Sequence, residues 1–349
     1  MPDMNIMKKL MNGKEGKTNM IKVRNTENIM DVCNDFVTIC KLNQTELKKE
    51  LHKILKKKYK GNVINGDGYL YTKGNDVLLT AHLDTTPNVG GSKRKKVRNV
   101  FMECHESKGK GKHVLSSPQG IGGDDRCGVY MILRILNDTE FRPSILFCED
   151  EEIGCVGSSK FAETEYISEI SNLKFLIELD RRGNNDLVFY DDENEDFHEW
   201  CEKVTGYKEN YGSCSDISNL MPESKRSGVN LSCGYYDEHT LKETVILEEM
   251  LGTLKATEKL IEASRTLSEP FEFVEYVPKT RDWWYGNSYS DGYYNNWYDC
   301  VVETTIVWRD LDGIRKAVYE GRDEYECLAT FFMDHDKVCY ADIEEYYLS

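Results

Sequence analysis

The sequence predicts an α/β fold, a three-layer α/β/α sandwich with a mixed, largely parallel central sheet. Three short apolar runs bounded by turn residues are typical of buried strands, and they are Val77–Ala81, Ser144–Cys148 and Phe175–Leu179. Amphipathic helical patterns follow, with apolar faces over residues 129–136 and 247–261. Strands that alternate with helices favour a sheet covered on both faces.

Two further elements are expected before the first apolar run. Residues 43–60 read as an amphipathic helix, because Leu47, Leu51 and Leu55 recur at four-residue steps on one face. The glycine-rich stretch 61–68 that follows contains Asn-Gly and Asp-Gly pairs, which predict a hairpin.

The chain has 349 residues, enough for one large core and a small appendage. We expect an N-terminal leader over residues 1–26 and a main domain over 27–268. Residues 269–309 form a Tyr/Trp-rich linker, and residues 310–349 look like a small helical C-terminal appendage. No internal repeat interrupts this organisation.

Charge and composition exclude several classes of partner. The formal net charge of −16 repels phosphate backbones, so we expect no nucleic-acid partner. No apolar stretch reaches the length that spans a bilayer, which argues against a membrane partner, and no signal peptide is visible. Twelve cysteines in so long a chain, without a Cys-x-x-Cys pair, predict reduced thiols and a cytoplasmic location.

Histidines and carboxylates cluster in five short segments, several of which directly follow an apolar run. The segments are Ala81–Asp84, Gly123–Asp125, Asp150–Glu152, Glu178–Asp180 and Glu238–Thr240. Ligands of open α/β sheets bind outside the carboxyl ends of the strands, so these side chains are expected to meet. Two imidazoles and three carboxylates can hold a pair of zinc-like ions, with one carboxylate left for proton transfer.

Each segment also has a structural interpretation. His82 and Asp84 emerge on the same side of a strand end, where a carboxylate can orient an imidazole, although His-x-Asp is common by chance. Asp124 and Asp125 are either a helix cap with a first-turn charge or a bridging carboxylate, and an unusual or cis peptide between them is expected only if the site requires it.

The remaining segments also have both a structural and a functional interpretation. Glu151 and Glu152 are either part of a solvated acidic loop or a metal ligand beside a proton-transfer group. Arg181 is more often a structural counter-charge than a fork for a substrate carboxylate. His239 alone would be read as a capping or surface residue, and here it supplies the second imidazole.

Taken in order, the segments resemble the co-catalytic zinc peptidases. They are most similar to the M20 family, in its peptidase T-like and carboxypeptidase-like branch, with kinship to the M28 and M42 families. The resemblance covers about residues 43–264, so the main domain is expected to be a metallopeptidase catalytic domain with a zinc-exopeptidase-like fold.

The resemblance implies a role for each site residue. His82 and Asp180 would hold one metal ion, Glu152 and His239 would hold the other, and Asp124 would bridge both. Asp84 would orient His82, and Glu151 would be the general base and acid. Arg181 and Tyr236 are the residues expected to bind substrate. The cofactors would be two divalent ions, zinc first, with cobalt or manganese as alternatives.

The sequence departs from the family pattern between the last two ligands. Only 58 residues separate Asp180 from His239, too few for the lid or dimerisation domain of M20 enzymes. The insertion typical of M42 enzymes is also missing. The chain therefore looks like a lidless catalytic domain, whose pocket would be shaped by residues 93–119 or by the Tyr/Trp-rich tail.

The function expected is metal-dependent hydrolysis of a peptide bond in small peptides by an exopeptidase or dipeptidase. An N-acyl amino acid amidohydrolase would use the same site. A non-catalytic binding module is the alternative from a different class, although the complete set of ligands and Glu151 argue against it.

Overall fold

The computed structural model describes residues 21–86, 97–107 and 110–275, together with short strands at 8–9, 88–89 and 92–93. All of these belong to one compact unit, Met1–Pro278. The expected appendage over residues 310–349, the linker beyond residue 275 and most of the expected leader lie outside the described residues. In the part of the chain that is described, no helix is long and apolar enough to cross a membrane.

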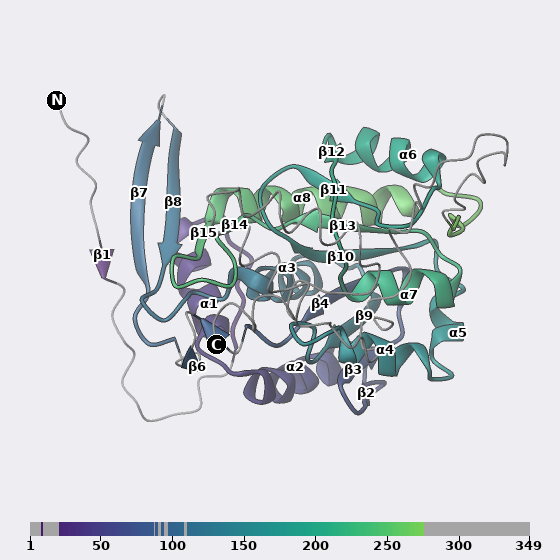
Figure 1. Cartoon of the computed structure of the whole chain (residues 1–349), viewed down its shortest axis with the longest axis horizontal. Coiled ribbons are helices and arrows are strands. Elements are labelled where there is room, and N and C mark those ends of the chain that lie inside the picture. Colours follow the sequence, from purple (N-terminus) through teal and green to yellow (C-terminus); the bar gives the residue numbers. More distant parts are fainter. Residues whose placement is uncertain are drawn as a thin grey trace, which may run out of the picture. The chain divides into compact units, whose positions relative to one another are not determined.

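An eight-stranded mixed sheet forms the centre of the fold, as the sequence predicts (Figure 1). Its strand order is β12-β11-β13-β10-β4-β9-β3-β2. The four middle strands β13, β10, β4 and β9 are parallel, and antiparallel pairs flank them on both sides. The strands are β2 (Ile64–Asn65), β3 (Tyr69–Thr72), β4 (Asn75–His82), β9 (Pro143–Cys148), β10 (Phe175–Arg181), β11 (Asp186–Val188), β12 (Lys208–Glu209) and β13 (Gly228–Ser232).

The central strands bury both faces, which is why they read as continuous apolar runs. Successive side chains of a strand point to opposite faces, and two separate cores result. Leu79, Ile145 and Ile177 belong to the larger core on one face. Leu78, Leu146 and Leu176 belong to the smaller core on the other. The three-layer sandwich expected from the sequence is therefore confirmed.

Helices cover both faces of this sheet. Helices α3 and α8 pack on one face with α1 outside them, whereas α4 and α7 pack on the other. The helices are α1 (Ile29–Cys40), α2 (Gln44–Lys58), α3 (Gly123–Asp138), α4 (Val156–Ala162), α5 (Ile167–Ile170), α6 (Glu195–Thr205), α7 (Asp216–Ser224) and α8 (Leu247–Ser264).

The predicted local elements before the first central strand are present. Helix α2 begins at a capping box, in which the Asn43 side chain accepts from the Glu46 N–H and the Glu46 carboxylate accepts from the Asn43 N–H. The hairpin expected over residues 61–68 is formed by β2 and β3, with Ile64 opposite Tyr71. Upstream, Arg24 binds Asp35 of α1 through its side chain, at 2.6 Å between Nη2 and Oδ1.

A second, antiparallel sheet lies beside the central one, in the order β1-β7-β8-β15-β14. Strands β7 and β8 form a long hairpin, and β8 pairs with β15, the strand that follows His239. This hairpin occupies much of the stretch 93–119. The strands are β1 (Lys8–Lys9), β7 (Phe101–Ser107), β8 (Lys110–Ser116), β14 (Tyr235–Tyr236) and β15 (Thr244–Ile246); β5 (Asn88–Val89) and β6 (Ser92–Lys93) form a separate pair.

The interval between Asp180 and His239 contains only elements of these layers. After β10 it comprises β11, α6, β12, α7, β13 and β14, all of them described. Three of the four strands in this interval extend the central sheet. The interval therefore supplies the edge of the sandwich, as its length suggested, and holds no separate lid.

Candidate metal centre and active site

Three parallel neighbours of the central sheet carry most of the candidate site at their carboxyl ends. His82 is the last residue of β4, Asp180 is the penultimate residue of β10, and Glu151 and Glu152 follow β9 closely. Because β10, β4 and β9 are adjacent and parallel, these ends meet at one edge of the sheet. Asp124, in the first turn of α3, faces the same edge.

Asp124 lies between the two imidazoles of the site. Its Oδ1 is 2.8 Å from His82 Nε2, and its Oδ2 is 3.1 Å from His239 Nε2. One carboxylate therefore contacts two separate histidines, one through each of its oxygens. This is the arrangement that a bridging ligand requires.

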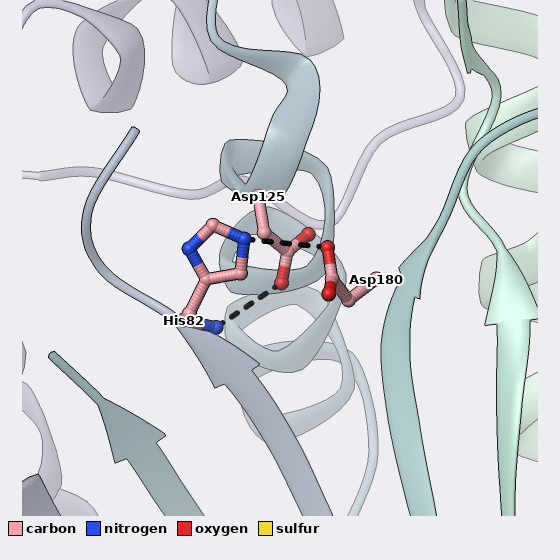
Figure 2. Close-up of side chains that lie close together, drawn as sticks. All are labelled: His82, Asp125 and Asp180. Atoms are coloured by element: carbon pink, nitrogen blue, oxygen red, sulfur yellow. Dashed lines mark hydrogen bonds and ion pairs between the residues drawn. The ribbon is translucent and has the colours of Figure 1, made fainter. Parts of the chain in front are cut away.

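Each imidazole has a second carboxylate of its own. Asp180 Oδ1 lies 3.3 Å from His82 Nε2, and Figure 2 shows the two side chains turned toward each other from β10 and β4. Glu152 Oε2 lies 2.8 Å from His239 Nε2. The five residues expected to be ligands are thus brought together as two groups that share Asp124.

Asp125 accepts hydrogen bonds from backbone N–H groups around the site. It is fully buried, and its Oδ2 accepts from the His82 N–H at 3.3 Å (Figure 2). Its Oδ1 accepts from the Gly128 N–H at 2.8 Å. It also lies close enough to His82 and Asp180 for the three to form a group that could hold a metal ion. The peptide bond between Asp124 and Asp125 is cis, and both residues depart from helical φ and ψ.

Asp84 connects His82 to the turn that carries both glutamates. Its Oδ1 lies 3.2 Å from His82 Nδ1 and accepts from the Glu151 N–H at 3.0 Å. Its Oδ2 accepts from the Glu152 N–H at 3.0 Å. A carboxylate on Nδ1 leaves Nε2 of His82 directed at the site, so Asp84 fixes one imidazole and one turn together.

Replacing Asp84 with asparagine is expected to lower metal affinity about 10- to 100-fold, because the amide nitrogen cannot accept one of the three hydrogen bonds. A competition titration against a chromophoric chelator measures this. Asp67→Asn is the matched control, since Asp67 is an exposed carboxylate that pairs with Lys160. Equal affinities for Asp84→Asn and the unaltered protein would remove this role from Asp84.

Glu151 lies at the edge of the cluster with its carboxylate close to a thiol. Its Oε1 is 3.6 Å from Cys155 Sγ. Burial raises the pKa of Glu151 to about 9; the positive charge of His82 opposes this shift, whereas Asp180 adds to it. Among the described residues, no hydrogen bond or ion pair joins the Glu151 carboxylate to either imidazole, which leaves it available for proton transfer.

Sequence reasoning missed the residues that hold the candidate ligands in place. Ser215 Oγ donates to Asp180 Oδ2 at 2.9 Å, and the Tyr235 hydroxyl donates to the Asp180 carbonyl at 3.0 Å. Glu243 accepts from the N–H groups of Gly122 and Asp124 at 2.7 and 3.0 Å. No motif marks Ser215 or Glu243, because each acts through a contact distant in sequence.

The two residues expected to bind substrate, Tyr236 and Arg181, differ in whether their polar groups already have partners. The Tyr236 hydroxyl donates to Glu249 Oε2 of α8 at 2.6 Å, so its polar end is engaged within the domain. Arg181 ends β10 next to Asp180, and its buried Nε has no hydrogen-bond partner among the described residues. The neighbouring Arg182 pairs with Glu238 at 2.7 Å, as a structural counter-charge does.

The donor set fits divalent cations. Burial raises the pKa of Asp180 to about 7 and raises that of Glu178 well above its usual range, and neighbouring carboxylates add to both shifts. Hydrogen bonds to Asp124 and Glu152 raise the pKa of His239 to about 11. The buried Glu152 Oε1 has no hydrogen-bond partner in the described chain. A bound metal ion compensates both the excess of negative charge and a buried carboxylate oxygen that has no hydrogen-bond donor.

Comparison with known sequence families finds a match to a family of peptidases. Residues 64–219 match the sequence model of Peptidase family M28. This segment includes His82, Asp124, Glu151, Glu152 and Asp180, and it ends before His239, which the fold then brings to the other residues. The sequence motifs predict M20 as the most similar family and M28 as a related one. The matching model is that of M28. A search of curated proteins found no match.

Solved structures of peptidases resemble the chain at low identity. The aminopeptidase PepT of Bacillus cereus ATCC 10987 is 14% identical, with a TM-score of 0.48 over 67% of this chain and 98% of its own. A tripeptidase of Staphylococcus aureus subsp. aureus Mu50 is 12% identical, with a TM-score of 0.48 over 71% and 100%. The aminopeptidase APDkam598 of the archaeon Desulfurococcus kamchatkensis is 13% identical, with a TM-score of 0.49 over 67% and 95%.

The match to a peptidase family and the two histidine–carboxylate groups agree on an enzyme. Within the zinc-exopeptidase superfamily, which these findings support, the match favours M28 and lends the M20 branch no support. The protein is a hydrolase.

Proposed function

We propose that the protein is a dinuclear metallopeptidase that hydrolyses a peptide bond in small peptides. The observation that carries this proposal is the position of Asp124, whose two oxygens face His82 and His239 at 2.8 and 3.1 Å. His82, Asp180 and Asp124 would hold one ion, and His239, Glu152 and Asp124 would hold the other. Zinc is the proposed metal, because imidazole and carboxylate ligands with an open position suit it.

The proposed roles of the metal ions, Glu151 and Asp84 follow from the groups that the site contains. Two bound divalent ions supply Lewis-acid polarisation of a carbonyl and activation of water near neutral pH. Glu151 accepts the proton of the attacking water and delivers it to the leaving amine. Asp84 keeps His82 oriented and holds the turn of Glu151, so that base and ligand keep a fixed relation.

An exopeptidase or dipeptidase is the form of the activity that we propose. The peptidase-family match supports peptide hydrolysis, and the interval between Asp180 and His239 consists of elements of the two sheets and their helices. Within the superfamily we propose kinship to M28. We also propose a reducing, cytoplasmic setting, since the nine described cysteines are all free thiols.

Hydrolysis of a dipeptide panel tests the proposal. The full chain is loaded with zinc, cobalt or manganese and assayed with and without a chelator. We expect cleavage that the chelator abolishes and that returns when metal is added back. If no dipeptide or tripeptide is cleaved in a chelator-sensitive way under any of the three metals, the proposal fails.

The second candidate is an N-acyl amino acid amidohydrolase. The observation that keeps it open is Arg181, whose buried Nε has no hydrogen-bond partner among the described residues and lies next to the ligand Asp180. A guanidinium there suits a substrate carboxylate, which both substrate classes carry. Assays of acylated against free-amine substrates separate the two, because only a peptidase prefers the free amine.

A further inference from the structure

A buried arginine in the first turn of α3 contacts backbone carbonyls of two separate segments near the site. Arg126 is 2% exposed. Its Nη1 donates to the Leu83 carbonyl at 2.8 Å and to the Asp84 carbonyl at 3.1 Å, and its Nη2 donates to the Leu42 carbonyl at 3.3 Å. Burying a charged group is costly unless its donors are hydrogen-bonded, so these contacts constrain both the guanidinium and the backbone that it meets.

The contacts of Nη1 lie on the segment that ends β4. The neighbouring residue Asp125 accepts from the His82 N–H at 3.3 Å (Figure 2). Two successive residues of α3 therefore hold residues 82–84, Asp125 at an N–H group and Arg126 at the two carbonyls that follow. The backbone position of Asp84 is thereby set by the first turn of α3.

The side chain of Asp84 joins this backbone to the turn of the two glutamates. It accepts from the N–H groups of Glu151 and Glu152, both at 3.0 Å, and its Oδ1 contacts Nδ1 of His82. Hydrogen bonds weaken steeply as their distances and angles depart from the preferred range. A shift of the Asp84 backbone would therefore weaken all three contacts together.

The contact with Leu42 leads to the same turn from its other side. Leu42 lies between α1 and α2, two residues before Gln44, which begins α2. Gln44 Nε2 donates to Asp150 Oδ1 at 3.0 Å, and the Asp150 N–H donates to Gln44 Oε1 at 3.4 Å. Arg126 is thus connected to Asp150 through one set of contacts and to Glu151 through another.

We propose that Arg126 is a positioning residue of the metal centre, which holds the turn of Glu151 and Glu152 in place relative to α3. Asp124 belongs to the same first turn as Arg126, so one helix start carries the bridging carboxylate and also fixes the residues that face it. Arg126 acts through backbone carbonyls and through Asp84. This role rests on the proposed function, because it takes Glu152 as a ligand and Glu151 as the base.

Replacing Arg126 with lysine is expected to lower the zinc affinity of the full chain about tenfold. An ammonium presents its donors from a single atom and cannot reproduce the planar fork that meets these carbonyls. Competition against a chromophoric chelator measures the affinity, and thermal unfolding establishes that the substituted chain folds. An unchanged zinc affinity in Arg126→Lys would overturn the proposal.

Arg142→Lys is the matched control. Nη1 of Arg142 also donates to two backbone carbonyls, those of Thr139 at 3.1 Å and Phe141 at 2.6 Å. These residues precede β9, whereas the site lies beyond the carboxyl end of that strand. Arg142→Lys should therefore bind zinc as the unaltered protein does, and an equal loss in both substituted chains would mean that the effect of Arg126 is not specific to the site.

A double-mutant cycle separates positioning through Asp84 from general support of the fold. Zinc affinity is measured for Arg126→Lys, for Asp84→Asn and for the chain that carries both changes. If Arg126 acts through Asp84, the double variant should lose less affinity than the product of the two separate losses. Losses that multiply would show that the two residues act independently and would overturn the proposal.

Hydrogen exchange of the zinc-saturated full chain gives a readout that needs no substrate. The Glu151 and Glu152 amides donate to Asp84, so both should exchange faster in Arg126→Lys and at the normal rate in Arg142→Lys. Unchanged exchange at both amides would contradict the positioning role. If these measurements come out as expected and no dipeptide is cleaved, the proposed function fails while Arg126 keeps its role in holding the turn.

Discussion

Replacing Glu151 with glutamine is expected to abolish peptide hydrolysis while both metal ions stay bound. An amide cannot accept the proton of the attacking water or deliver one to the leaving amine, and such proton transfer contributes about 10²- to 10⁴-fold to a rate. The ligand atoms of the two groups lie on other residues, from Asp124 Oδ1 and Oδ2 to Glu152 Oε2. The measurements are kcat on a cleaved dipeptide and zinc content by elemental analysis.

A neighbouring acid provides the control for this substitution. Asp150 precedes Glu151, and its Oδ1 accepts from Gln44 Nε2 at 3.0 Å, a bond that asparagine can also accept. Asp150→Asn should therefore retain near-normal kcat. An account in which Glu151 serves only as a further metal ligand predicts a lower zinc content in Glu151→Gln; that result, or retained activity, would contradict the role assigned to Glu151.

Replacing Asp124 with alanine is expected to disturb both metal ions at once. Asp124 is the residue that approaches both imidazoles, so its loss removes a ligand from each group. It also leaves the Nε2 atoms of His82 and His239 with one carboxylate each, Asp180 and Glu152 respectively. We expect the zinc content to fall from about two ions per chain to about one or fewer, with activity below detection.

The control for Asp124 comes from the other end of the same helix. Asp138 ends α3, and its Oδ2 pairs with Arg134 Nε at 2.6 Å, away from the site. Asp138→Asn should keep the full zinc content, with thermal unfolding measured for both substituted chains to establish that they fold. Retention of both ions by Asp124→Ala would show that the two groups do not depend on a shared ligand.

The sequence predicts the sandwich and the grouping of the candidate ligands because both depend on local patterns. Strands buried on both faces read as continuous apolar runs, as Val77–Ala81 does, and the residue after such a run lies at the sheet edge. His82 and Asp180 lie at the ends of adjacent parallel strands for that reason, and Glu152 follows the neighbouring strand β9. Helix α2 was predictable from its leucine spacing.

The supporting contacts could not be predicted, because they join segments that only the fold brings together. Glu243 accepts from the backbone of Gly122 and Asp124 from 119 or more positions away, and nothing near Glu243 in the sequence marks it. The sequence analysis assigns a functional role to Tyr236 alone, yet the adjacent Tyr235 is the one that contacts Asp180. Which of two adjacent side chains faces a site depends on strand pairing, here of β14 with β15.

Anomalous X-ray scattering at the zinc edge, from crystals of the zinc-loaded full chain, tests the central claim most directly. The account predicts two zinc peaks, one beside His82 and Asp180 and one beside His239 and Glu152, with Asp124 contacting both. A single peak, or two peaks of which Asp124 contacts only one, would contradict a dinuclear site bridged by this carboxylate.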